Sequence, residues 1–223
     1  MNKTKQVWEK VSAMNIKATF TLGPINAESL IRDPKHLAFT LSRYKFAAKM
    51  LKECKHIIEI GCGEGIGVFT FLSETGADIT AIDFDENQIK YATEYVLPLT
   101  NGRARFLCKD MIASPYKGRK ADGLVCIDVI EHIHHRQEED FFYNTVSCLK
   151  KGGIAVLGTP NKHADKYASA RSRQGHINTF TPERLSSALK GYFSHVFLFS
   201  MNDEMVHTGF YNMAHYLIAL CIR

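Results

Sequence analysis

Three side chains that could move a proton or hold a cation stand together in the stretch CIDVIEHI. Asp128 directly follows an apolar run, and Glu131 and His132 come three and four residues later. If a helical turn starts at Asp128, this spacing puts all three side chains on one face. A histidine with a pKa near neutral, or a bound cation, can deprotonate or polarise a hydroxyl group. We therefore expect chemistry at this position.

A glycine-rich turn supplies a second candidate site. The stretch HIIEIGCGEGIG, residues 56–67, indicates a strand that runs into a turn and then a helix. Gly61, Gly63 and Gly65 let the backbone turn sharply and approach a ligand closely, because they lack a Cβ. The helix that follows offers free N–H groups at its start. This context predicts a nucleotide-binding turn.

The spacing of the glycines discriminates between nucleotides. A dinucleotide fingerprint needs a third small residue at position 66, where this chain has Ile66, and Gly67 comes one place too late. A phosphate-binding Walker loop is excluded because no Gly-Lys-Ser/Thr follows. A nicotinamide-dependent oxidoreductase, the alternative from another enzyme class, is therefore disfavoured.

Acidic residues at the next two strand ends narrow the ligand further. Asp83 ends the apolar stretch of ITAIDFD, and an acid there can accept hydrogen bonds from both hydroxyls of a ribose. Asp110 follows FLCK, where its carboxylate could take the exocyclic amine of an adenine while Met111 packs on the ring. Together with the glycine turn, these residues predict an adenosine-bearing ligand.

The elements that must position these residues alternate between strand and helix. Strands are predicted at 56–60, 77–82, 104–108, 123–127 and 154–158, and helices at 35–53, 65–74, 85–97 and 137–150. A further helix begins at Pro182 behind the cap Thr181, and two last strands, 195–200 and 215–221, are expected to pair antiparallel. The predicted fold class is α/β. It is a doubly wound, Rossmann-like, mostly parallel sheet of about seven strands, with an antiparallel C-terminal pair and helices on both faces.

Composition limits the class of protein and of partner. Apolar residues make up 45% and charged residues 23% of the 223 residues, which supports an ordinary globular core. The formal charge of +5 is modest, and we do not expect a nucleic-acid partner. The six cysteines contain no C-x-x-C pair, and no apolar stretch is long enough to span a membrane. We therefore expect a cytoplasmic location; the oligomeric state stays open.

The motifs EIGCGEG, AIDFD, CKDM, CIDVIEHI and LKKGGIAVLGTPN resemble those of class I S-adenosylmethionine-dependent methyltransferases over about residues 36–200. The resemblance implies that S-adenosyl-L-methionine is the cofactor. It implies that Asp83 binds the ribose and that Asp110 and Met111 hold the adenine. The other cofactor contacts it implies are Glu59, Gly61, Gly63 and Gly65 at the methionine end, Arg43 and Tyr44 closing over the cofactor, and Phe84 and Asp128.

Two subgroups of that family carry a Glu-His pair after the fourth strand. These are the ubiquinone-pathway O-methyltransferases and the small-RNA terminal 2′-O-methyltransferases, in which the pair joins a divalent-metal site completed by a later histidine. His176, in the pattern H-x-x-x-F-T-x-x-x-L, is the matching residue here. The resemblance thus implies catalytic roles for Glu131, His132 and His176, and a metal site of Asp128, Glu131, His132 and His176 for Mg²⁺ or Zn²⁺. Asp128 stands where the RNA enzymes have glutamate.

The predicted function is O-methylation of a small molecule, or of a sugar in a polysaccharide precursor. The alternative within the same family is an RNA 2′-O-methyltransferase with a divalent metal. Residues 1–35 are expected to be a lid that covers the acceptor, together with loop 159–180, and residues 36–223 the methyltransferase domain. Phe210, Tyr211 and Tyr216 are candidate walls of the acceptor pocket.

Overall fold

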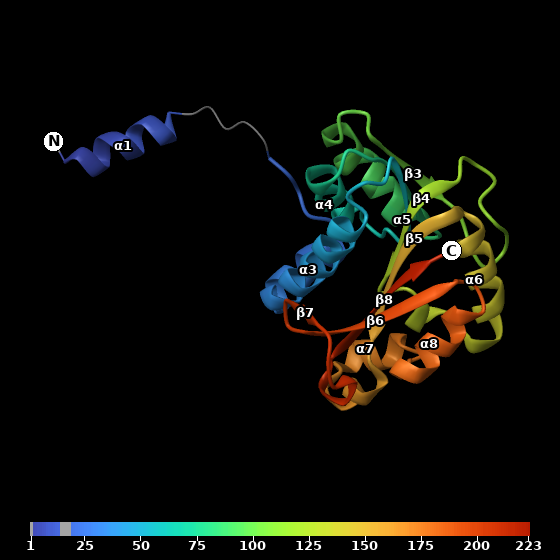
Figure 1. Ribbon diagram of the computed structural model, residues 1–223. Helices are drawn as coiled ribbons and strands as arrows, with labels where there is room; N and C mark the ends of the chain where they lie inside the picture. The colour runs from blue at the N-terminus through green and yellow to red at the C-terminus, as the bar shows by residue number, and fades with distance from the viewer. Residues whose placement is uncertain (1, 14–18) are drawn as a thin grey trace.

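The computed structural model describes residues 2–13 and 19–223. A central eight-stranded sheet has helices against both faces (Figure 1). The sheet order is β3-β2-β1-β4-β5-β8-β6-β7. The strands are β1 (His56–Ile60), β2 (Asp78–Asp83), β3 (Ala104–Cys108), β4 (Ala121–Ile127), β5 (Leu149–Pro160), β6 (His195–Asn202), β7 (Met205–His207) and β8 (Tyr216–Ile222).

The helices fall before, between and after these strands. The α-helices are α1 (Lys3–Ser12), α2 (Pro24–Arg32), α3 (Pro34–Met50), α4 (Ile66–Glu74), α5 (Glu86–Tyr91), α6 (Glu138–Ser147), α7 (Ala170–Gly175) and α8 (Pro182–Lys190). A π-helical turn (Ala92–Val96) follows α5, and 3₁₀ turns lie at Leu97–Leu99, Ile130–His132, His135–Gln137, Lys162–Tyr167 and Tyr211–Met213. Within the described ranges, no helix is long and apolar enough to cross a membrane.

The predicted α/β class and doubly wound sheet are confirmed. Strands β1 to β5 run parallel, and β8 lies antiparallel between β5 and β6. Two apolar cores lie on the two faces: one includes side chains of α3 and α4, the other side chains of α6 and α8. In β1, Ile57 belongs to the first core and Ile58 to the second, as the alternation of a strand requires.

The structure differs from the sequence prediction in several elements. Strand β5 begins at Leu149 rather than at 154, and α5 ends at Tyr91 rather than at 97. The sheet has an eighth strand, β7, which is only three residues long and lies in a polar connection with no apolar alternation to reveal it. Helix α6 ends at Ser147 rather than at 150, because Leu149 already pairs with Ala121 and an irregularity in the register follows before Gly123. Residues 1–34, whose periodicity is weak, contain α1 and α2.

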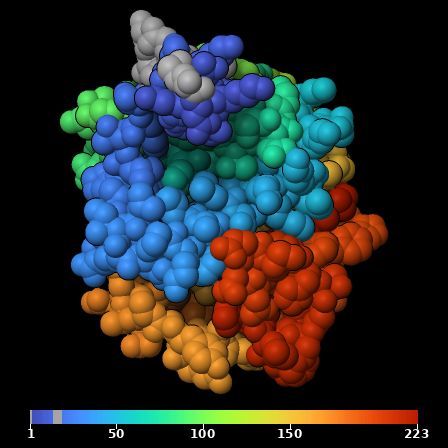
Figure 2. Space-filling view, turned by 90° about the vertical axis from the view of Figure 1, so that its left-hand side faces the viewer, coloured from blue at the N-terminus to red at the C-terminus, as the bar shows by residue number. Residues whose placement is uncertain are grey.

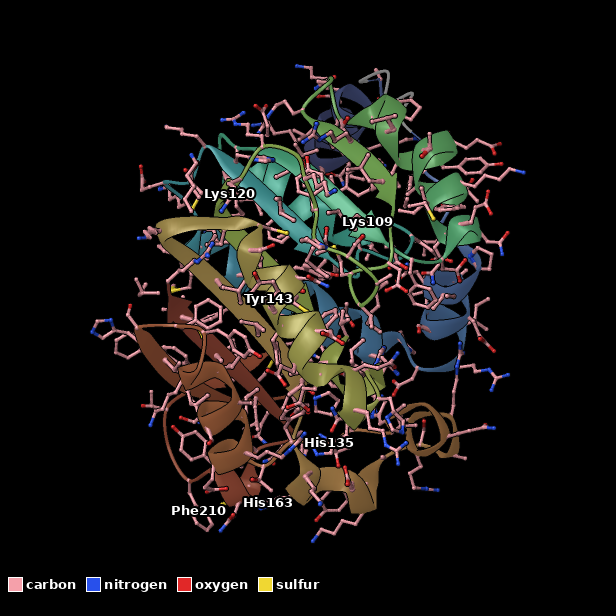
Figure 3. All side chains as sticks on the ribbon, turned by 90° about the vertical axis from the view of Figure 1, so that its right-hand side faces the viewer. Lys109, Lys120, His135, Tyr143, His163 and Phe210 are labelled. Atoms are coloured by element: carbon pink, nitrogen blue, oxygen red, sulfur yellow. The ribbon has the colours of Figure 1, made fainter. Side chains whose placement is uncertain are left out.

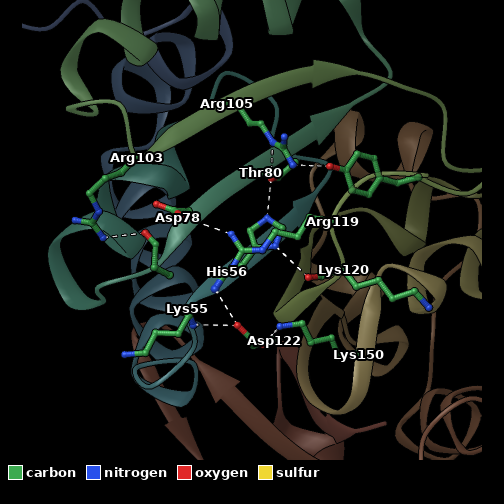
Figure 4. Close-up of polar contacts among 12 residues, drawn as sticks. Lys55, His56, Asp78, Thr80, Arg103, Arg105, Arg119, Lys120, Asp122 and Lys150 are labelled. Carbon is green, nitrogen blue, oxygen red and sulfur yellow. Dashed lines mark hydrogen bonds and ion pairs between the residues drawn. The ribbon is translucent and has the colours of Figure 1, made fainter.

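Charged side chains make hydrogen bonds and ion pairs at the edge of the sheet formed by the amino-terminal ends of the parallel strands (Figure 4). Arg103 donates to the carbonyl oxygens of Leu72 at 3.1 Å, Thr75 at 2.8 Å and Ala77 at 2.9 Å, so that one guanidinium holds the connection from α4 to β2. On the same edge, the one polar side-chain contact of Arg119 among the described residues is a long ion pair with Asp78, 3.8 Å between Nη1 and Oδ2. The two arginines should therefore differ in their contribution to stability.

We predict that Arg103→Ala lowers the free energy of unfolding by about 2 kcal/mol, because three carbonyl groups lose a charged donor. Arg119→Ala is the matched control and should change it by less than about 0.5 kcal/mol, since its pair is exposed. Urea unfolding followed by circular dichroism measures both. Equal losses in the two variants would contradict the assigned role of Arg103.

Candidate active site

A cavity of about 660 Å³ opens at the carboxyl ends of β1, β2, β3 and β4. Helices α2 and α3 supply its other wall, and Figure 2 shows these blue N-terminal helices next to the teal residues that follow β1 on one face of the molecule. The residues that line the cavity include Ile25, Asn26, Ser29, His36, Thr40, Tyr44, Gly61, Gly63, Glu64, Asp83, Phe84, Lys109, Asp110, Met111, Asp128, Val129 and His132.

The glycine turn forms one end of this cavity. Gly61, Gly63 and Gly65 have φ values of 76°, 53° and 82°, a left-handed conformation that side chains rarely adopt. A Cβ on Gly61 would lie 2.1 Å from Cγ2 of Val129. The turn therefore needs glycine at this position both for its backbone conformation and for the close approach of the segment after β4.

Two acids flank the turn, one lining the cavity and one buried beneath it. Asp83 is buried, and its carboxylate accepts hydrogen bonds from N–H of Gly63 at 2.8 Å and of Asp85 at 2.9 Å. Glu59 is only 1% exposed, and neither carboxylate oxygen has a hydrogen-bond partner among the described residues. Burial raises the pKa of Glu59 to about 8, and the charge of Asp83 adds to the shift.

The residues predicted for the adenine lie at the far end of the cavity. Asp110 is exposed, and its Oδ1 accepts from N–H of Ile112 at 2.7 Å, which leaves Oδ2 for a ligand. Met111 is buried and lines the cavity beside it, while the Phe84 side chain is 76% exposed at the rim. The structure thus brings Asp83, Asp110 and Met111 to one cavity.

Asp128, which lines the cavity, forms an ion pair with Arg43, 2.7 Å between Nη1 and Oδ2. The guanidinium lies 3.8 Å from the ring centroid of Tyr216, a cation–π contact. Burial acts to lower the pKa of Arg43, but the charge of Asp128 and the other neighbouring acids outweigh it, and the net pKa is raised. Tyr44, the other member of the predicted pair, is buried and lines the cavity.

No helical turn starts at Asp128, so the arrangement expected from the spacing of Asp128, Glu131 and His132 is wrong. Asp128 takes a left-handed conformation, φ 57°, and the turn that follows is a 3₁₀ turn over Ile130–His132. As a result Glu131 points inward, 1% exposed, whereas His132 is exposed and its Nδ1 contacts the carbonyl oxygen of Gly175 at 2.9 Å. The three side chains do not share one helical face.

Glu131, His132 and His176 nevertheless come together. Their nearest ligand atoms lie within 4.8 Å of one another, and the two imidazole rings are 5.1 Å apart between centroids. Oε2 of Glu131 accepts from the Thr159 hydroxyl at 3.1 Å, and burial, with the charge of Asp128, raises the pKa of Glu131 to about 8. Burial and the neighbouring His132 lower the pKa of His176. Asp128 lies outside this group, since it pairs with Arg43.

Two parts of the site differ from expectation. Phe210, Tyr211 and Tyr216 do not line the cavity: Tyr216 is buried under Arg43, and Figure 3 shows Phe210 at the periphery, far from Lys109, which does line it. Sequence reasoning also missed Glu64 and Asn26, which meet across 38 residues of chain. The one signal in the sequence for this contact is the presence of an acidic residue, Glu64, inside the glycine turn.

Known proteins that resemble this chain in sequence or in fold are methyltransferases. A family model described as a methyltransferase domain matches residues 32–192. Ubiquinone biosynthesis O-methyltransferase from Rickettsia canadensis is 32% identical over 111 residues, half of this chain and 45% of that protein. The same enzyme from Rickettsia bellii is 33% identical over 111 residues, again half of this chain and 44% of that protein. The match therefore spans less than half the length of these relatives.

Solved structures share the fold at low sequence identity. The methyltransferase domain of bacterial CtHen1-C has a TM-score of 0.68 at 16% identity and covers 82% of this chain and 98% of that one. The plantazolicin methyltransferase BpumL in complex with SAH has a TM-score of 0.67 at 14% identity and covers 89% of both chains. The chain belongs to the methyltransferase-domain family.

We predict that Gly61→Ala abolishes binding of S-adenosylhomocysteine, because its Cβ meets Val129 and its φ is positive. Gly102→Ala is the control: Gly102 has φ 75°, but a Cβ there meets nothing within 4 Å. Gly102→Ala should lower stability by about 1 kcal/mol and leave binding intact. Calorimetric titration measures binding, and weakened binding in both variants would argue against a local effect.

Proposed function

We propose that this protein transfers a methyl group from S-adenosylmethionine to a hydroxyl oxygen of a small molecule or of a sugar. The observation that carries the proposal is the convergence of the glycine turn, Asp83 and Asp110 on one cavity. His132 also lines this cavity, and Glu131 and His176 lie next to His132. The relatives named as ubiquinone biosynthesis O-methyltransferases support an oxygen acceptor.

The charge of the cavity supports a cationic cofactor. Its lining contains four carboxylates, Glu64, Asp83, Asp110 and Asp128, and one lysine, Lys109. A sulfonium and an ammonium group suit such a lining, whereas the pyrophosphate of a dinucleotide does not. Membership of the methyltransferase family sets the nicotinamide-dependent oxidoreductase aside.

The cofactor contacts follow from the positions of the side chains. Asp83 would accept from the ribose hydroxyls, and Asp110 with Met111 would hold the adenine. At the methionine end, we assign Gly61, Gly63 and Gly65 to close backbone contacts. The unpartnered carboxylate of Glu59 beneath the turn fits a role in holding that end. Arg43, Tyr44, Phe84 and Asp128 complete the set.

Methyl transfer to oxygen requires a place for the acceptor's proton. When bound, the cofactor would supply an electrophilic methyl group, to whose carbon the acceptor oxygen would bond while the sulfur would keep the electron pair of the broken bond. A lowered pKa leaves His176 neutral at pH 7, so its imidazole can take the hydroxyl proton. His132 stands beside it at the cavity wall.

The same three side chains could hold a divalent cation. One carboxylate and two imidazoles within 4.8 Å fit the ligand preferences of Zn²⁺, and a cation there would polarise the acceptor hydroxyl. Asp128 is the weaker member of the predicted ligand set, because its carboxylate is engaged by Arg43. We also propose that the segment before residue 36 covers the site, since Ile25, Asn26 and Ser29 form part of the wall.

The proposed function is tested by measuring where a labelled methyl group is transferred. Incubated with cell extract and methyl-labelled S-adenosylmethionine, the protein should label a small-molecule or glycan fraction. Asp83→Asn should abolish labelling and weaken S-adenosylhomocysteine binding more than about tenfold, because a buried amide replaces a charged acceptor. Asp78→Asn, exposed at the opposite edge of the sheet, is the matched control. Label in RNA alone would favour the 2′-O-methyltransferase alternative, and unchanged binding by Asp83→Asn would refute the cofactor site.

The metal hypothesis can be tested without knowing the acceptor. Titration with ZnCl₂ or MgCl₂ should show one binding event that Glu131→Gln and His176→Ala both abolish, because each removes a ligand. His135→Ala, which removes an exposed histidine outside the group, should bind as the unaltered protein does. Absence of binding in the unaltered protein would leave His132 and His176 as direct acid–base groups.

A further inference from the structure

Glu64, inside the glycine turn, makes its hydrogen bonds to a distant helix. Oε1 accepts from N–H of Ile25 at 2.8 Å, and Oε2 accepts from N–H of Asn26 at 3.0 Å and from its side-chain amide at 2.6 Å. Glu64 is only 5% exposed. A carboxylate of the cofactor turn therefore caps the start of α2.

Helix α2 depends on this cap because its own sequence supplies none. Gly23 stands at the N-cap position with no side chain to accept a hydrogen bond, and the first turn contains no acid. The N–H groups at the start of a helix need acceptors, and a negative charge there is favoured by the helix dipole. Glu64 answers both requirements at once.

Directly before α2, the Tyr91 hydroxyl donates to the carbonyl oxygen of Thr21, and Phe20 packs edge-on against Phe69. Helix α2 itself has few further attachments. None of its residues is buried, and Asp33 alone separates it from α3, which is fixed in the core through Tyr44 and Ala47. Glu28 pairs with Arg171 of α7 at 2.7 Å, but both side chains are exposed, and such pairs contribute little. The short link at Asp33 can serve as the hinge about which α2 moves.

Movement of α2 would open the cavity, since Ile25, Asn26 and Ser29 line it. Glu64 also follows directly on Gly63, whose N–H donates a hydrogen bond to Asp83, the proposed ribose contact. A continuous chain of contacts thus runs from Asp83 through the turn to α2.

We propose that Glu64 is a positioning residue that latches α2 over the cofactor cavity and so controls how fast the spent cofactor leaves. This inference rests on the proposed cofactor site. It assigns to an acidic residue of the glycine turn a role in release, distinct from the contacts that the turn's glycines make with the cofactor. The position of α2 is thereby coupled to whether the cavity holds a ligand.

Gly23 offers a second way to break the latch without altering the turn. Its φ of −62° and ψ of 158° suit alanine, but a Cβ there would lie 2.2 Å from Cδ of Glu64. Gly23→Ala must therefore push the carboxylate away from α2. Glu64→Ala removes the carboxylate itself, and Glu74→Ala, an acid paired with Lys49 on the surface, is the matched control.

The experiment measures release of labelled S-adenosylhomocysteine into excess unlabelled ligand, together with hydrogen exchange of the peptide covering α2. Glu64→Ala and Gly23→Ala should each speed release by about tenfold and remove protection of the α2 amides, because a charge-assisted cap is lost. Glu64→Gln, which keeps one acceptor oxygen, should fall between. The double variant should release no faster than Glu64→Ala, since both changes act through one carboxylate.

The outcomes separate the latch from the cofactor site. Unchanged release in both single variants, unchanged exchange of α2, or an additive double variant would overturn the latch. Faster release in Glu64→Ala alone would also overturn it, because the effect would then lie in the turn. If the unaltered protein fails to bind S-adenosylhomocysteine, the proposed cofactor site falls instead, while loss of α2 protection in Gly23→Ala still supports the latch.

Discussion

The ion pair between Arg43 and Asp128 is the constraint around which the site is arranged. It joins α3 to the end of β4, and the stacking of Arg43 on Tyr216 extends the contact to β8. A buried charge without its partner is costly, so each of the two residues depends on the other for its position. Because Asp128 is held in a left-handed conformation, the chain after β4 turns Glu131 inward and His132 toward the cavity.

That arrangement places two buried acidic groups near the site where a cationic ligand would lie. Burial raises the pKa of both Glu59 and Glu131 to about 8, since neither carboxylate can be hydrated as in water. A cation placed near them favours their ionised forms and is itself stabilised. The site is therefore better suited to a positively charged methyl donor, or a metal ion, than to a phosphate.

Much of the fold could be predicted from the sequence, because the parallel strands are buried apolar runs with glycine or acid at their ends. The bounds of β1 and β3 agree residue for residue with prediction, and Asp83 and Asp110 do reach one cavity. The conformation of Asp128 and the burial of Glu131 were missed, because the side-chain partners of both, Arg43 for Asp128 and Thr159 for Glu131, are distant in sequence. The cap on α2 was missed for the same reason: no local pattern shows that Glu64 will accept from Ile25.

The two walls of the cavity are built from different parts of the chain. The cofactor half is built from consecutive strand ends within the matched family range, so membership of the family is informative about the donor. The opposite wall includes Ile25, Asn26 and Ser29, which precede residue 32, where the family match begins. Acceptor choice is expected to depend on that wall, because side chains there are free to vary without disturbing the sheet.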